Sequence, residues 1–271
     1  MAPPRSTAAT GPPGGRLASD RRGTTGPPLV LAHGFTQTRG AWGPVADDLA
    51  ADHRLLLVDL PGHGGSSGIA ADLPTGARLL ADAGGAGSYV GYSMGGRFCL
   101  HLALRTPELV DRLVLLSTTP GIVDADERAA RRAADEALAD ELDPPGADPA
   151  GDAERRDAFL RRWLAQPLFA SLPPEADALS ERRRNSAAGL ASSLRLAGTG
   201  TQLPLWAELA SLAMPVLVIT GAEDAKFDAI ARQMVAAIGP KAAHVSVPGA
   251  GHAVHLERPG DVAAAIRDFG A

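Results

Sequence analysis

Short apolar runs alternate along the chain with segments in which apolar residues recur at helical spacing. Six runs have the length of strands and are largely apolar: residues 29–32, 55–58, 88–91, 113–116, 216–220 and 244–247. Such strands are typical of a parallel sheet that is covered by helices on both faces. Helical periodicity occurs at residues 42–51, 94–105, 227–238 and 261–269. The pattern therefore predicts an α/β fold with a mostly parallel central sheet.

The alternation stops between residues 121 and 205, where no strand pattern occurs. Asp124 with Glu127 three positions later resembles a capping box, which predicts a helix that runs to about residue 142. After a turn-rich connector, further helices are predicted at residues 152–166, 174–185 and 186–196. An all-helical insertion between two strands of a parallel sheet is expected to form a lid. We therefore assign residues 29–120 and 206–271 to the core and residues 121–205 to the lid.

The first 28 residues are rich in Pro, Gly, Ala, Thr and Arg. They lack the apolar run of a signal peptide, so a flexible leader is the simplest interpretation. Arg21 and Arg22 could belong to a twin-arginine export signal. Few apolar residues follow them before a loop with catalytic character begins, so we disfavour export.

Composition narrows the class of protein. A length of 271 residues suits one large domain, and a net charge of −5 gives no sign of nucleic-acid binding. The single cysteine, Cys99, excludes a disulfide framework and suggests a cytoplasmic setting. No run approaches the roughly 20 apolar residues of a membrane helix, so no stable membrane insertion is expected. The histidines show no metal-ligand spacing, and the oligomeric state stays open.

A G-x-S-x-G motif lies between the third predicted strand and the helix that follows it. Its serine is Ser93, flanked by Gly91 and Gly95. This strand–turn–helix context is the one in which the motif presents a nucleophilic hydroxyl on a tight, strained turn. We assign the oxyanion hole to the backbone N–H groups of Met94, at the start of that helix, and of Phe35, in the loop after the first strand.

The acid and the base of a catalytic triad are expected after two later strands. Asp224 follows residues 216–220, and His252 follows residues 244–247. The order Ser, Asp, His is that of α/β-hydrolases. Glu223 and His255 are alternatives for the acid and the base, but the glycines before His252 allow a tight loop over the serine. The other histidines are expected to be structural, and His33 is a candidate for ordering the oxyanion loop.

Several motifs together resemble the α/β-hydrolase superfamily. They are His33-Gly-Phe35, Asp59-Leu-Pro-Gly-His-Gly64, Gly91-Tyr-Ser-Met-Gly-Gly96 and Gly251-His252. The resemblance covers the chain from about residue 29 to its C-terminus. It implies an α/β-hydrolase fold in which the first antiparallel strands of the superfamily are missing or degenerate.

A narrower resemblance is to the menaquinone-pathway synthases of the MenH type. The segments that carry it begin at Gly91, Pro120, Trp163, Arg184 and Asp224. It implies a carbon–oxygen lyase without a cofactor that releases pyruvate from a succinyl-enolpyruvyl-hydroxycyclohexene carboxylate. In this family the triad serine is thought to act as a base: His252 would deprotonate Ser93, which would remove a proton beside the succinyl ketone.

The same resemblance implies a set of substrate-binding residues. Arg97, Arg131 and Arg184 match the family's arginine positions, and Tyr92 and Trp163 match positions that shape the pocket. Guanidinium groups suit a small-molecule polycarboxylate substrate because they bind carboxylates through two parallel hydrogen bonds. The lid as a whole is not basic, since it holds 11 arginines and 15 acidic residues.

Two other functions remain open on the sequence. A serine hydrolase of an ester, a lactone or a carbon–carbon bond would use the same triad through an acyl-enzyme. A non-enzymatic member of the fold is a further alternative, although such proteins often lose a triad residue and this chain has all three.

Overall fold

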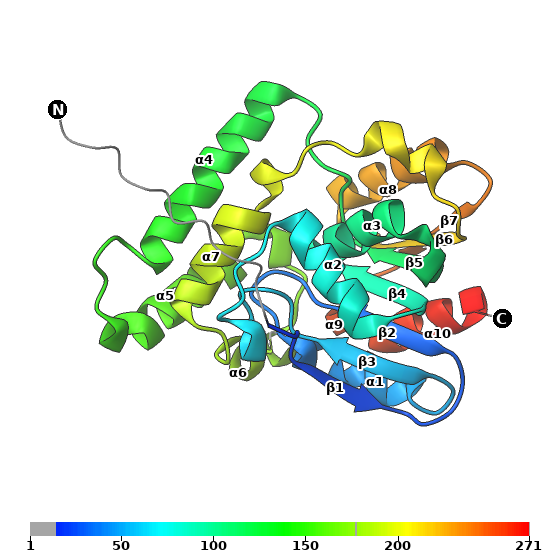
Figure 1. Ribbon diagram of the computed structural model, residues 1–271, viewed down its shortest axis with the longest axis horizontal. Helices are drawn as coiled ribbons and strands as arrows, with labels where there is room; N and C mark the ends of the chain where they lie inside the picture. The colour runs from blue at the N-terminus through cyan, green and yellow to red at the C-terminus, as the bar shows by residue number, and fades with distance from the viewer. Residues whose placement is uncertain (1–14, 177, 271) are drawn as a thin grey trace.

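The computed structural model describes residues 15–176 and 178–270 of the chain. At its centre is a seven-stranded sheet with the strand order β1-β3-β2-β4-β5-β6-β7 (Figure 1). The strands are β1 (Ser19–Arg22), β2 (Pro28–Ala32), β3 (Arg54–Val58), β4 (Gly87–Tyr92), β5 (Val110–Leu116), β6 (Val216–Gly221) and β7 (Ala242–Val247). Strand β1 is antiparallel to β3, and all other neighbouring strands are parallel.

Apolar side chains point from the sheet toward both of its faces. In β2, Val30 and Ala32 belong to the core cluster on one face, whereas Leu29 and Leu31 belong to the cluster on the other. This arrangement confirms the mostly parallel, doubly covered sheet that the apolar runs predict.

Helices pack on each face of the sheet and close the two apolar clusters. One face carries α2 (Leu73–Gly84), α3 (Met94–Arg105) and α8 (Ala225–Ile238), and the other carries α1 (Gly43–Leu49), α9 (Val254–Glu257) and α10 (Pro259–Gly270). The sequence pattern did not predict α2. Asp72 caps that helix by accepting the N–H of Thr75 at 2.8 Å, and Leu73, Ala77 and Leu80 bury its inner side.

The predicted 28-residue leader is wrong at its C-terminal end. Residues 1–14 of the leader lie outside the described residues, but Ser19–Arg22 forms β1. Its backbone pairs with the edge of β3, from Ser19 beside Val58 to Arg22 beside Leu55. An antiparallel strand of the superfamily is therefore present. The sequence pattern did not predict this strand because its residues are polar. An edge strand is stabilised by backbone pairing and does not require apolar side chains.

An all-helical insertion lies between β5 and β6. It contains α4 (Ala125–Leu142), α5 (Asp152–Leu164), α6 (Leu179–Arg182) and α7 (Ala187–Ala197). The capping interaction predicted for α4 is present, because Asp124 Oδ1 accepts the N–H of Glu127 at 2.8 Å. In Figure 1 the insertion lies beside the sheet, with α4 packed across α7. A small apolar cluster of its own, which includes Leu142, Phe159 and Leu190, holds these helices together.

The continuous helix predicted at residues 174–185 is wrong. A 3-10 turn at Pro174–Ala176 and the single turn of α6 stand in its place, and residue 177 lies outside the described residues. Ala178 has a left-handed backbone with φ 53°, which a continuous α-helix does not accommodate. This break determines which arginine of the insertion faces the interior.

Candidate active site

Ser93 occupies the sharp turn between β4 and α3. Its backbone has φ 50° and ψ −108°, a strained conformation for a residue that carries a side chain. The backbone on both sides of Ser93 lies in close contact with neighbouring backbone atoms. A Cβ at Gly91 would lie 2.5 Å from the carbonyl oxygen of Gly95, and a Cβ at Gly95 would lie 2.1 Å from that of Ala32. Both flanking positions therefore require glycine.

Loops after β6 and β7 bring the two predicted partners to this turn. The Nε2 atom of His252 lies 3.4 Å from Ser93 Oγ, and its Nδ1 atom lies 2.7 Å from Asp224 Oδ2. The other carboxylate oxygen of Asp224 caps α8 by accepting the N–H of Phe227 at 3.2 Å. His252 and Asp224 are both buried. The three residues have the geometry of a nucleophile, its base and the acid that orients the base.

The two alternative residues have other surroundings. His255 is fully buried, its Nε2 atom lies 3.3 Å from Gln37 Oε1, and its ring lies against Tyr92. Burial lowers the pKa of His255 well below its usual range. Glu223 lines a different cavity, which His252 also lines but Ser93 does not. The geometry therefore favours His252 and Asp224 for the two roles.

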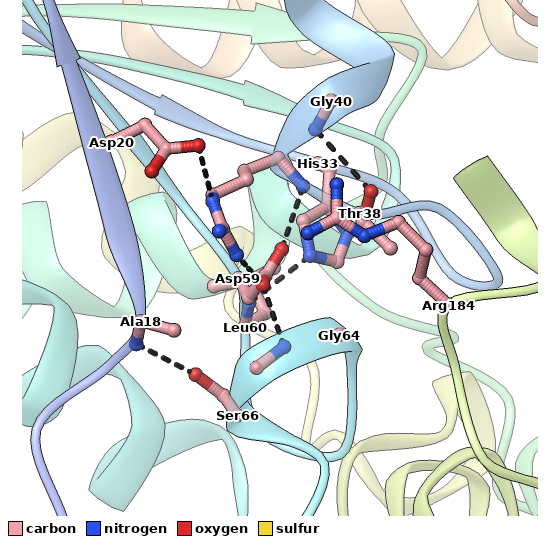
Figure 2. A network of polar contacts seen from close by, with 12 residues as sticks. Ala18, Asp20, His33, Thr38, Gly40, Asp59, Leu60, Gly64, Ser66 and Arg184 are labelled. Atoms are coloured by element: carbon pink, nitrogen blue, oxygen red, sulfur yellow. Dashed lines mark hydrogen bonds and ion pairs between the residues drawn. The ribbon is translucent and has the colours of Figure 1, made fainter.

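The loop after β2 carries one predicted oxyanion donor, and buried histidines hold it in place. His33 accepts the N–H of Leu60 at its Nε2 atom, 3.0 Å away (Figure 2). Its Nδ1 lies 2.8 Å from the carbonyl oxygen of Gly34. His63 accepts the N–H of Thr36 at 3.3 Å. Burial lowers the pKa of His33 to about 4 and that of His63 to about 3. Both rings are therefore neutral at pH 7 and can accept these bonds.

The two predicted oxyanion donors, Phe35 and Met94, line the same cavity as Ser93. Met94 is the first residue of α3, so helix geometry leaves its N–H without an acceptor in its own helix. Within residues 15–176 and 178–270, the N–H of Phe35 forms no hydrogen bond. Two backbone donors are thus free to stabilise a developing negative charge next to Ser93.

A cavity of about 360 Å³ opens above Ser93, between the sheet and the helical insertion. Tyr92, Trp163, Arg97 and Arg131 all line it, as expected. Of these four, Trp163 packs against Phe35, with 5.1 Å between the ring centroids.

Arg97 is buried at 6% exposure and donates to the backbone carbonyl of Ala197 at 2.8 Å. Within the described part of the chain it forms no ion pair. Burial, with a contribution from the nearby Arg131, lowers the pKa of Arg97 to about 10. The guanidinium is therefore still charged at neutral pH, in a position where an anion would stabilise it.

Arg131 is less deeply placed and already has a carboxylate partner. Its Nε donates to Asp135 Oδ1 at 2.8 Å, and the buried Asp135 also accepts the N–H of Gly200 at 3.1 Å. Asp135 therefore holds the guanidinium of Arg131 against the cavity while offsetting part of its charge.

Arg184 does not line the cavity, contrary to the sequence-based expectation. Its side chain is 49% exposed and pairs with Glu181 at 3.2 Å. Figure 2 shows it reaching toward Thr38 and Gly40, at the outer side of the oxyanion loop. Arg182, at 1% exposure, lines the cavity in its place and donates to Thr36 Oγ1. Three consecutive arginines occur here, and only the orientation of the short α6 turn decides which of them points inward.

Asn185 connects the insertion to the core. Its side-chain amide donates to the carbonyl oxygen of Thr36 at 2.7 Å and accepts the N–H of Gly64 at 2.8 Å. The sequence pattern assigned no role to this residue. These bonds join the arginine-bearing turn to the oxyanion loop, so the two parts of the cavity wall are held at a fixed separation.

Two further features of the described residues concern other kinds of function. Across residues 15–176 and 178–270, no group of three or more His, Cys, Asp or Glu side chains could hold a metal ion. No helix in those same ranges has the length and apolar character needed to cross a membrane.

Comparison with known proteins agrees with this geometry. Residues 27–259 match the family model described as the alpha/beta hydrolase fold. The 2-succinyl-6-hydroxy-2,4-cyclohexadiene-1-carboxylate synthase of Klebsiella pneumoniae is 34% identical over 249 residues, which cover 89% of this chain and 92% of that protein. The Escherichia coli protein of the same name is 32% identical over 260 residues, which cover 92% of this chain and 96% of that protein. The structure of MenH from S. aureus superposes with a TM-score of 0.82 at 29% identity, covering 93% of this chain and 97% of that one.

Proposed function

The chain belongs to the α/β-hydrolase fold family and is an enzyme of the MenH-like group within it, and from this premise we propose that it eliminates pyruvate from a succinyl-enolpyruvyl-hydroxycyclohexene carboxylate. The product would be 2-succinyl-6-hydroxy-2,4-cyclohexadiene-1-carboxylate, the compound in the names of its relatives. Ser93, His252 and Asp224 would perform the chemistry without a cofactor.

The first step is a proton transfer through the triad. His252 Nε2 takes the proton of Ser93 Oγ, and the serine oxygen removes the proton on the ring carbon next to the succinyl ketone. Asp224 holds Nδ1 of His252, so that the ring presents Nε2 to the serine, and stabilises the imidazolium that forms. The electrons of the broken C–H bond move onto the ketone oxygen, where the N–H groups of Phe35 and Met94 stabilise the enolate.

The second step breaks the carbon–oxygen bond. The enolate re-forms the ketone, and the electrons shift through the ring double bond and expel the enolpyruvyl oxygen. That oxygen leaves with the three-carbon fragment, whose methylene carbon takes up, directly or through water, the proton that His252 holds, so that the fragment becomes pyruvate and the triad returns to its starting state. The ring gains a second double bond in conjugation with the first.

The observation that carries this proposal is the placement of Arg97. It is a buried cation, one helical turn after Ser93, and its hydrogen bond goes to a neutral backbone carbonyl. Leaving a charge unpaired in a closed pocket costs several kcal/mol, so such a site favours an anionic ligand. Arg131 and Arg182 line the same cavity, which together with Arg97 supports a substrate with more than one carboxylate.

The proposal is tested by incubating the purified enzyme with the pathway intermediate and measuring pyruvate continuously. We expect release well above the spontaneous rate and its loss in a Ser93→Ala variant. A rate no greater than that of buffer alone would rule out the lyase reaction.

The alternative of a serine hydrolase is supported by the same triad distances, because Ser93 Oγ could form an acyl-enzyme at the same place. The two reactions separate on simple aryl esters, which carry no carboxylate for Arg97. Rapid turnover of such esters with a burst equal to the enzyme concentration would favour the hydrolase.

A further inference from the structure

A second cavity, of about 620 Å³, adjoins the one described above. We call the first cavity, lined by Phe35, Met94 and Trp163, the inner lobe. The second, lined by Ile122, Trp206 and Ile230, is called the outer lobe. Six residues line both lobes: Ser93, Arg97, Arg131, Thr199, Lys226 and Phe227. Because Ser93 belongs to both linings, its reacting hydroxyl lies where the two lobes meet.

The two lobes differ in what they offer a substrate. The oxyanion donors Phe35 and Met94 belong to the inner lobe alone, so the ketone of the substrate must lie on that side of Ser93. The outer lobe combines apolar residues with the carboxylates of Asp124 and Glu127 and with the three cations that it shares with the inner lobe. Its loop is held by Trp206, whose Nε1 donates to the carbonyl oxygen of Gly121 at 2.9 Å. At its rim Val123 is 66% exposed, so this lobe borders solvent.

Lys226 lies at the junction of the lobes. It is the second residue of α8 and follows Asp224 by two positions. Its ammonium lies 5.9 Å from the ring centroid of Phe227, and that ring lies 4.5 Å from the ring of His252. Lys226 forms no ion pair or hydrogen bond with any other residue in the described ranges 15–176 and 178–270. The chain has only one other lysine, Lys241, and that side chain donates to the carbonyl oxygen of Leu212 at 3.2 Å.

We infer that the outer lobe is the leaving-group subsite and that Lys226 binds the carboxylate of the departing three-carbon acid. This inference rests on the proposed function. The bond that breaks divides the substrate into a ring half, held through its ketone in the inner lobe, and an enolpyruvyl half. With the ketone fixed in the inner lobe, the enolpyruvyl half is directed from Ser93 toward the outer lobe, past the junction where Lys226 lies.

The properties of the outer lobe suit a fragment that must leave. Its boundary with solvent at Val123 offers pyruvate a path out of the site. A lysine ammonium is a compact, rotatable point charge, whereas an arginine binds a carboxylate through a rigid two-pronged contact. Lys226 at the junction thus suits the product that is released, while Arg182, which lines the inner lobe alone, suits the ring half.

The test is pyruvate binding to the full-length enzyme, measured directly by titration so that no turnover is needed. We expect Lys226→Met to raise the dissociation constant of pyruvate by about tenfold, the loss of one charge-assisted hydrogen bond. Lys226→Arg should restore most of the affinity, and Lys241→Met should match the wild type. Equal pyruvate affinity in the wild type and Lys226→Met, or no pyruvate binding to the wild type, would overturn the inference.

A steric pair of variants locates the subsite independently of charge. Ile230 lines the outer lobe alone and Leu138 the inner lobe alone. Ile230→Trp should weaken pyruvate binding, and Leu138→Trp should leave it unchanged, with folding of both checked by thermal unfolding. The reverse pattern would place pyruvate in the inner lobe and refute the subsite.

These outcomes separate the inference from the function on which it rests. If the wild type releases pyruvate but its affinity for pyruvate does not depend on Lys226, the subsite is refuted and the lyase proposal stands. If the wild type does not release pyruvate from the intermediate, the proposed lyase function is refuted, whatever the titration shows.

Discussion

The floor and the roof of the inner lobe are built in opposite ways. The floor comes from the sheet and its loops, where Ser93, His252 and Asp224 are joined to one another by short contacts and are set in the main core. The roof comes from the helical insertion, whose own apolar cluster is small and whose surface is rich in ion pairs. Under the proposed function, chemistry that depends on tenths of an ångström would thus be placed on the rigid part, and substrate recognition on an insertion that can vary without disturbing it.

The two regions also differ in charge. The histidines of the floor that hold the oxyanion loop are neutral at pH 7, because burial lowers the pKa of His33 to about 4 and that of His63 to about 3. The roof contributes the cations Arg131 and Arg182. Arg97 joins the two, since it stands on α3 and donates to Ala197 at the end of α7. The anionic substrate that we propose would therefore be drawn toward the roof while its reacting carbon stays on the floor.

Removal of the nucleophile from the floor should have the largest effect. Ser93→Ala should lower kcat for pyruvate release by about 10³-fold or more, because no other group can transfer the proton. Thermal unfolding should be nearly unchanged, since the serine hydroxyl contributes little to packing. Activity within tenfold of the wild type would show that the floor does not carry the chemistry.

Removal of the cation that joins floor and roof should act on binding. Arg97→Ala should raise KM by about 10- to 100-fold, the range expected for one charge-assisted hydrogen bond to a carboxylate, with a smaller change in kcat. Arg97→Lys should recover part of the loss, because it keeps the charge and gives up the two-pronged contact. A KM that is the same in all three proteins would exclude Arg97 from substrate binding.

Two arginines of the roof provide a matched comparison. Arg182→Ala should raise KM by about tenfold, because it removes a cation from the cavity wall. Arg184→Ala should change KM by less than about twofold, since its exposed ion pair with Glu181 contributes little. Steady-state kinetics of both variants under one set of conditions would check this. A larger effect at residue 184 than at residue 182 would contradict the orientation of α6.

The smallest expected effect concerns stability rather than activity. Burial lowers the pKa of His101 to about 4, and neither of its ring nitrogens has a hydrogen-bond partner in residues 15–176 and 178–270. Between pH 6.5 and about 4 the unfolded chain therefore binds a proton at this residue that the folded protein does not. The free energy of unfolding should fall as the pH is lowered through that window, by up to about 1.4 kcal/mol per pH unit from one such group.

The variant His101→Leu removes this titration and should flatten the pH dependence of unfolding over the same window. Urea unfolding of the wild type and the variant at several pH values measures the difference. Identical slopes would mean that His101 has the same proton affinity in both states. His33 and His63, which titrate in the same direction, remain in both proteins and provide the common background.

The core was largely predictable because its signals are local. Strands buried on both faces must be apolar throughout, and a nucleophile turn requires glycine on each side of the serine. Both features can therefore be recognised in a short stretch of sequence. Six of the seven strands were found in this way. The edge strand β1 was missed because backbone pairing with β3 stabilises it, and that leaves no apolar pattern.

The insertion was less predictable, since its functional residues depend on orientation. Arg182, Arg183 and Arg184 are identical in type, and a helix turns by about 100° per residue, so a break at Ala178 decides which one faces the cavity. The outer lobe could not be predicted from the sequence either, because its lining comes from five separate segments of the chain.

The amino-acid sequence by itself determined the sheet, the strained turn at Ser93 and the chain order of its two partners, because each depends on neighbours within a few positions. Only the tertiary structure decided that Arg182 rather than Arg184 faces the cavity, that Arg97 lacks a carboxylate partner among the described residues, and that two lobes meet at the serine. The reason is that orientation and pairing of charges depend on which distant segments the fold brings together.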